Sequence, residues 1–146
     1  MGGDHARTLA PRGKADAAAL AVWLAEQGLV PNAALCSTAT RTRETLGLVA
    51  PNTPTILSDK LYLASVGEML AQVQGTDDAI ETLLLVCHNP GAHGLLALLV
   101  GDYASDADAD KLLLKFPTSA CAVMEFNTAS WREMAAHGAR LVSLRY

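Results

Sequence analysis

A run of β-favouring, mostly apolar residues, Thr82 to Cys87, constrains the fold of this chain more than any other segment. A continuous run of this length, ended by turn-forming residues, is typical of a strand buried on both faces of a parallel sheet. The turn that ends it is His88-Asn89-Pro90-Gly91, and a helix is predicted from Ala92 to Val100. Ligands of open α/β sheets bind beyond the carboxyl ends of such strands. His88 is therefore a candidate functional residue, although a loop histidine packed against a helix start would give the same pattern.

Strand and helix patterns alternate along the rest of the chain. Ser65 and Glu68 have the spacing of a capping box at the start of one helix, whereas residues 102–110 are predicted to be a solvated acidic loop. A first helix is predicted to open at Ala10-Pro11, with its body over 15–27, and to end at Gly28. Further helices are predicted over 39–49 and 66–74, and further strands over 33–36, near Ile56, over 120–126 and over 139–145. This order predicts one domain, residues 1–146, with a three-layer α/β/α architecture and a largely parallel central sheet.

Composition and charge exclude several classes of function. Hydrophobic residues make up 51% of the chain, so disorder is excluded, and a net charge of −4 argues against a general nucleic-acid or anionic-membrane surface. The longest apolar run, residues 17–25, is too short to span a bilayer. The three cysteines have no close spacing and are expected to be reduced thiols, so a cytoplasmic protein is expected. His88 and His93 are five residues apart, which does not place two metal ligands on one helical face, so no metal site is expected from them.

A second group of polar residues follows the predicted strand over 33–36. Ser37 begins the turn, and Arg41 falls in the first turn of the next predicted helix. A cation at this end of a helix opposes the helix dipole, unless an anion is shared between the guanidinium and the free N–H groups. The alternative is that Arg41 and Arg43 belong to a solvated face paired with Glu44. A cysteine-phosphatase loop is excluded, because His93 stands where that Cys-x5-Arg loop from Cys87 needs arginine.

Four segments, taken in order, resemble the histidine phosphatase superfamily, whose fold is phosphoglycerate mutase-like, and within it the SixA-type phosphohistidine phosphatases. They cover nearly the whole chain, and together they are more specific than any one alone. The segments are Arg7-Thr8-Leu9-Ala10-Pro11-Arg12-Gly13, Ser37-x-x-x-Arg41-x-x-x-Thr45, Leu85-Val86-Cys87-His88-Asn89-Pro90 and Lys115-Phe116-Pro117-Thr118-Ser119-Ala120.

The resemblance implies a cofactor-free phosphatase that acts on a phosphohistidine protein or a phosphorylated small molecule through a phosphohistidine intermediate. It implies that Arg41 is a bidentate clamp on the phosphoryl group and that His88 donates to one of its oxygens. Ser37 is implied as a further hydroxyl contact, and Thr118 and Ser119 as residues that line the mouth of the site. Fixed positive donors suit phosphoryl transfer, because its transition state spreads charge over three oxygens.

The chain departs from the family pattern in one respect. The family begins with a strand ending in Arg-His, which supplies the nucleophilic histidine, and no part of this sequence matches that strand. His5 is not a substitute, because Asp4-His5-Ala6-Arg7 resembles the loop that follows the motif. We therefore expect a domain without its first strand and little turnover from these residues alone. A non-catalytic phosphate-binding regulatory domain remains the alternative, and a plain α/β interaction domain is a third reading. Glu68 is a candidate for the general acid, although its capping role is the simpler explanation of this residue.

Overall fold

The computed structural model describes residues 3–146, which form two compact units. The first unit contains residues 3–62 and 79–87, and the second contains residues 63–78 and 88–146. The prediction of a single domain over residues 1–146 stays a prediction. Each unit has its own three-stranded sheet and its own helices.

The first unit is built on a parallel sheet with the order β2-β1-β3. Strand β1 (Ala33–Ser37) lies in the middle and is almost entirely buried, which makes it the core of the unit. Its partners are β2 (Thr55–Ser58) and β3 (Leu83–Val86). The sequence predicts that the β3 run is buried on both faces, but its residues are only half-buried and pair with β1 alone among the described strands. That prediction is wrong because β1 occupies the central position.

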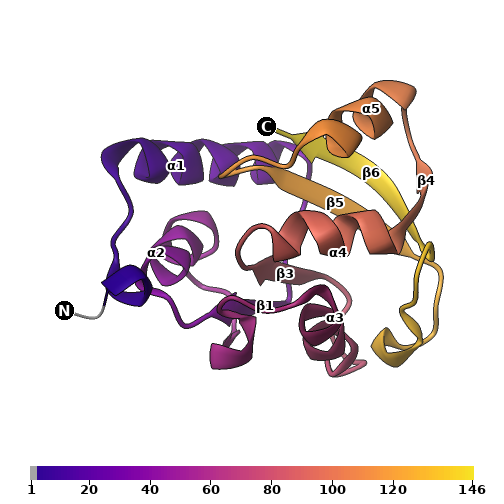
Figure 1. The fold of residues 1–146 in the computed structure, drawn as a ribbon, viewed down its shortest axis with the longest axis horizontal. Helices are drawn as coiled ribbons and strands as arrows, with labels where there is room; N and C mark the ends of the chain where they lie inside the picture. Colours follow the sequence, from indigo (N-terminus) through magenta and orange to yellow (C-terminus); the bar gives the residue numbers. More distant parts are fainter. Residues whose placement is uncertain (1–2) are drawn as a thin grey trace. The chain divides into compact units, whose positions relative to one another are not determined.

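Two helices accompany this sheet, and they contact each other (Figure 1). Helix α1 (Pro11–Glu26) starts with proline at a position where the missing N–H costs nothing, and it ends before Gly28, which has a positive φ of 69°. Helix α2 (Thr40–Val49) packs Leu46 against Ala34 and Cys36 of β1. Two short 3-10 turns complete the unit, η1 (Gly3–Ala6) and η2 (Asp59–Leu61).

The second unit is built on a mixed sheet with the order β4-β6-β5. Strand β6 (Ala139–Arg145) pairs in parallel with β4 (Val100–Tyr103) and antiparallel with β5 (Cys121–Phe126). Leu96, Leu112 and Leu141 form its core, with Val100. The helical elements are α3 (Val66–Gln74), α4 (Gly91–Leu99), α5 (Asp106–Leu114) and the 3-10 turn η3 (Trp131–Glu133).

Two elements of the second unit were not predicted. Strand β4 begins where α4 ends, in a segment too short and polar to stand out as a strand. Residues 106–110 are not a solvated loop, because they form the start of α5. The Ser105 hydroxyl caps this helix by accepting from the Asp108 N–H at 3.1 Å, and acidic residues in a first turn complement the helix dipole.

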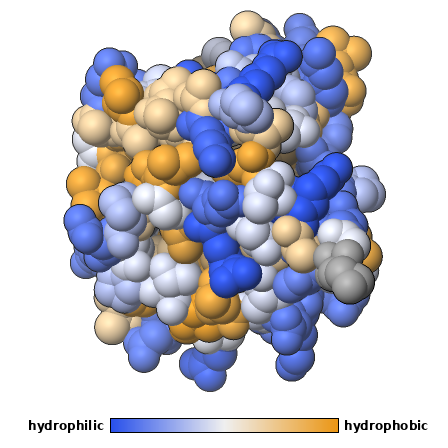
Figure 2. All heavy atoms as spheres, turned by 90° about the vertical axis from the view of Figure 1, so that its left-hand side faces the viewer, coloured by the Kyte–Doolittle hydropathy of each residue, from blue (hydrophilic) through white to orange (hydrophobic). Residues whose placement is uncertain are grey.

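The structure confirms the α/β class with mostly parallel strands, since three of the four strand pairings are parallel. The three cysteines are free thiols, as predicted. Within residues 3–146 no helix has the length and apolar character needed to cross a membrane. The face drawn in Figure 2 mixes hydrophilic and hydrophobic residues, so its orange areas are interrupted by blue ones.

Gly101 in β4 is predicted to be essential for packing. A Cβ atom there would overlap the main-chain carbonyl of His137, and His137 itself has a positive φ of 61°. We expect Gly101→Ala to lower the free energy of unfolding by about 1–3 kcal/mol, as overpacked sites do. Gly47→Ala in α2 is the matched control, because a Cβ there meets nothing within 4 Å. It should raise stability by about 0.5–1 kcal/mol. Urea unfolding of both variants measures the difference, and equal effects would contradict the packing argument.

Candidate functional site

The carboxyl end of β1 leads directly into α2 through a turn built by Ser37. Ser37 is fully buried, its Oγ accepts from the Ala39 N–H at 3.3 Å, and its carbonyl accepts from the Thr42 hydroxyl at 2.9 Å. These bonds fix the direction in which α2 leaves the sheet. The role of Ser37 as a substrate contact stays a prediction, and in this structure its hydroxyl also shapes the turn that carries Arg41.

Arg41 lies in the first turn of α2, with 20% of its side chain exposed. Its Nη1 donates to the main-chain carbonyl of Asp4 at 2.8 Å, and its Nη2 donates to the Asp4 carboxylate at 3.1 Å. The alternative, in which Arg41 and Arg43 form a solvated face paired with Glu44, does not agree with these contacts. Glu44 accepts from the Leu9 N–H at 2.9 Å, and Arg43 donates to the Thr38 carbonyl at 3.0 Å. Arg41 is therefore a partly shielded cation at the N-terminal end of a helix.

The Asp4 carboxylate is held by more than Arg41. The Tyr62 hydroxyl donates to the same carboxylate oxygen at 2.5 Å, and Arg7 lies 3.4 Å from the other oxygen. The Tyr62 hydrogen bond, together with Arg41, holds the pKa of Asp4 below its ordinary value. Because these contacts favour the charged form, their stabilisation is present above the ordinary pKa of aspartate and is lost as the pH falls through the lowered one.

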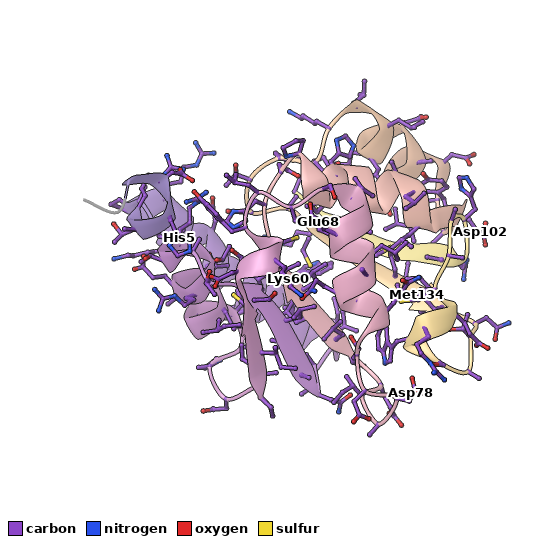
Figure 3. All side chains as sticks on the ribbon, turned by 60° about the horizontal axis from the view of Figure 1, so that its bottom comes forward. His5, Lys60, Glu68, Asp78, Asp102 and Met134 are labelled. Atoms are coloured by element: carbon purple, nitrogen blue, oxygen red, sulfur yellow. The ribbon has the colours of Figure 1, made fainter. Side chains whose placement is uncertain are left out.

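His5, which is labelled in Figure 3, follows Asp4 in η1 and makes a separate contact with the turn before α2. Its Nε2 is 2.9 Å from the Thr38 hydroxyl, which in turn donates to Asp59 at 2.5 Å. The His5 ring also meets the Tyr62 ring edge-on, with 4.8 Å between centroids. Since the Thr38 proton is directed at Asp59, His5 acts as the donor to Thr38. His5 thus has a local role in attaching η1.

In the second unit, His88 opens the turn that leads into α4. Its carbonyl accepts from the Ala92 N–H at 2.9 Å. The next residue, Asn89, accepts from the His93 N–H at 3.2 Å, so it satisfies one free N–H of the first helical turn. The Asn89 amide also donates to the Phe116 carbonyl at 2.5 Å. This side chain joins the His88 turn to the segment that carries the other two predicted site residues.

Those two residues, Thr118 and Ser119, form a tight turn before β5. The Ala120 N–H donates to the Pro117 carbonyl at 3.1 Å, Thr118 is exposed and Ser119 is half-buried. Ser119 has a φ of 68°, a conformation that costs a residue with a Cβ about 1–2 kcal/mol. Strained backbone of this kind is found often at functional sites.

The Glu68 side chain takes part in the capping box that the sequence predicts at the start of α3. Its carboxylate accepts from the Ser65 N–H at 3.0 Å, and the Ser65 hydroxyl accepts from the Glu68 N–H at 3.2 Å. The hydrogen bond from the Ser65 backbone lowers the pKa of Glu68. A general acid at neutral pH needs a raised pKa, so the capping role is the better explanation. Glu68 projects from the start of α3 in Figure 3.

The other two histidines have main-chain partners. A ring nitrogen of His93 is 2.6 Å from the Leu112 carbonyl, and a ring nitrogen of His137 is 3.3 Å from the Val100 carbonyl. Over residues 3–146 no three His, Cys, Asp or Glu side chains are grouped so that they could hold a metal ion.

The predicted site residues are therefore distributed over both units. Ser37 and Arg41 lie together in the first unit, and His88, Thr118 and Ser119 lie in the second. The contacts of Asp4 with Arg41 and with Tyr62 were not predicted, because Asp4 is distant from both residues in sequence and no local pattern marks it. A shielded guanidinium at a helix N-terminus is suited to bind an oxyanion.

Comparison with known sequences gives close relatives without a described function. The chain is 36% identical over 140 residues to an uncharacterized protein of Mycobacterium tuberculosis, which covers 95% of this chain and 88% of that protein. It is 32% identical over 140 residues to an uncharacterized protein of Mycobacterium leprae, with coverage of 96% and 86%. No family model matches the chain.

Solved structures give a more informative match. A protein of Nakamurella multipartitia assigned as the phosphohistidine phosphatase SixA superposes with a TM-score of 0.86 and 30% identity, covering 98% of this chain and 86% of that one. A protein of Agrobacterium tumefaciens with the same assignment gives 0.79 and 26%, with coverage of 98% and 85%. The protein histidine phosphatase SixA complexed with tungstate gives 0.75 and 22%, with coverage of 99% and 86%, and shows the fold alone.

The backbone of Ser119 offers a direct test of the turn. Glycine adopts a positive φ without strain, so Ser119→Gly should be about 1 kcal/mol more stable than Ser119→Ala in urea unfolding. Both variants remove the hydroxyl, so the difference isolates the backbone. Equal stability of the two variants would show that the turn is not strained.

Proposed function

The chain belongs to the SixA group of the histidine phosphatase superfamily, and from this premise we propose that it is a phosphoric monoester hydrolase. It hydrolyses phosphohistidine, in which phosphorus is bonded to nitrogen, or a phosphomonoester, through a phosphohistidine intermediate. The observation within the chain that supports this most is the place of Arg41, a partly shielded guanidinium in the first turn of α2 after a buried parallel strand. A helix N-terminus and a guanidinium both favour a phosphoryl group.

The residues have separate roles in this proposal. Arg41 clamps two phosphoryl oxygens, and His88 donates to a phosphoryl oxygen as negative charge builds up. Ser119 and Thr118 contact the group that carries the phosphate. Ser37, a fully buried residue, sets the start of α2 and adds a further hydroxyl contact to the phosphoryl group. These donors lower the barrier because they are already oriented when the transition state forms.

The chemical step needs a nucleophilic histidine. A ring nitrogen attacks phosphorus, the bond to the substrate nitrogen or oxygen breaks, and the leaving group takes up a proton. Water then attacks the phosphohistidine, which releases orthophosphate and restores the histidine. The four histidines of this sequence do not match the family's nucleophile, which is the histidine of the Arg-His pair that ends the family's first strand. We expect residues 1–146 to bind phosphate and to show little turnover. A chain in which the Arg-His strand precedes these residues should hydrolyse para-nitrophenyl phosphate.

The alternative hypothesis is that the chain is a regulatory domain that binds phosphate without hydrolysing a substrate. It shares the roles of Arg41 and His88, so anion binding alone does not separate the two. Binding without hydrolysis by a chain that carries the Arg-His strand would favour it.

Anion binding tests the role of Arg41 directly. Tungstate is a suitable probe, because it is a tetrahedral oxyanion and the SixA structure noted above is complexed with it. We expect Arg41→Ala to raise the tungstate Kd by about 10- to 100-fold, which corresponds to the loss of a charge-assisted pair worth ~1.4–2.8 kcal/mol. Isothermal titration calorimetry measures this on the 146-residue chain.

Arg43→Ala is the matched control, because it removes the same charge two residues away on the same helix. We expect it to change the Kd less than about 3-fold, as a distant screened charge does. Urea unfolding of both variants shows whether the fold is kept. A plain interaction domain would leave the Kd of both variants equal, or would bind no tungstate at all.

A further inference from the structure

Asp4 contacts the Arg41 guanidinium through two different groups. Its main-chain carbonyl accepts from Nη1 at 2.8 Å, and its carboxylate accepts from Nη2 at 3.1 Å. Two acceptors on two nitrogens fix both the position and the plane of a guanidinium, which one contact would not do. A guanidinium carries five N–H groups, so binding to Asp4 through two of them is compatible with binding an anion through others.

Asp4 is itself fixed from several directions. Tyr62 donates to the carboxylate oxygen that Arg41 contacts, and Arg7 pairs with the other oxygen. The same 3-10 turn is attached to the start of α2 by His5 through the Thr38 hydroxyl. All of these residues belong to the first unit. An aspartate with this many partners is a fixed support for Arg41.

We propose that Asp4 is a positioning residue, which holds the Arg41 guanidinium in the orientation that binds the substrate oxyanion. The inference rests on the proposed function, since it assigns Asp4 a part in anion binding through Arg41. The opposing interpretation is an inhibitory contact, in which the carboxylate occupies Arg41 and must leave before an anion binds. The contacts favour positioning, because departure would also break the bonds to Tyr62 and Arg7 and the main-chain bond.

The two interpretations predict opposite changes in anion affinity when Asp4 is replaced. A carboxylate repels a nearby anion, so removing the Asp4 charge should tighten anion binding if Asp4 only competes or repels. If Asp4 positions Arg41, its removal should weaken anion binding despite the lost repulsion, because the guanidinium then samples other orientations. The direction of the change therefore decides between them.

The test measures tungstate affinity by calorimetry for the unchanged chain, Asp4→Asn, Asp4→Ala and Tyr62→Phe. We expect Kd to rise about 3- to 10-fold in Asp4→Ala and less in Asp4→Asn, which keeps a carbonyl oxygen as acceptor. Tyr62→Phe should give a smaller rise, because it removes only the support of the carboxylate. Glu26→Gln, on an exposed residue at the end of α1, removes the same charge and should leave Kd unchanged.

A second comparison separates positioning from general damage to the fold. In an Arg41→Ala background, Asp4→Ala should have no further effect on Kd, because it acts only through Arg41. A further loss there would show a merely structural role and overturn the inference. Unchanged or tighter binding in Asp4→Ala alone also overturns it, while leaving the proposed function intact. Failure of the unchanged chain to bind tungstate would instead overturn the proposed function, and the positioning role with it.

Discussion

The bonding of strand β1 on both sides is the constraint on which the first unit depends. Because β2 and β3 both pair with it in parallel, the place where β1 ends is fixed, and Ser37 converts that end into the start of α2. Arg41 follows within one helical turn. A buried apolar strand thus determines where a charged side chain lies, although the two have no direct electrostatic relation.

The ion pair between Asp4 and Arg41 then orients the side chain that the sheet has positioned. A cation at a helix N-terminus is unfavourable alone, and the Asp4 carboxylate offsets this cost in the free chain. The first unit therefore contains both Arg41, a cation suited to bind an anion, and Asp4, the carboxylate that holds Arg41. In the second unit, the Asn89 side chain has a comparable organising role, since it joins the His88 turn to Phe116, just before the turn of Ser119.

Much of the fold was predictable because local patterns agree with the tertiary structure. Helices bounded by Pro11 and Gly28, and the capping box at Ser65, follow from local backbone chemistry. Strand β4 was not predictable, since it exists through pairing with β6 and through a glycine that lies close to His137. In the site, local position marks Arg41 and the family resemblance gives its role, whereas its contact with Asp4, 37 residues away, depends on tertiary folding that no local pattern records.

The proposed function requires that Arg41 and His88 bind the same oxyanion, as the family resemblance implies. A double-mutant cycle in tungstate affinity tests it most directly, with Arg41→Ala, His88→Ala and the two combined. Each single change should weaken binding, and the combined effect should differ from their sum by about 0.5–3 kcal/mol, as for residues that share a partner. Effects that add within about 0.5 kcal/mol, or a His88 variant that binds as the unchanged chain does, would contradict the account.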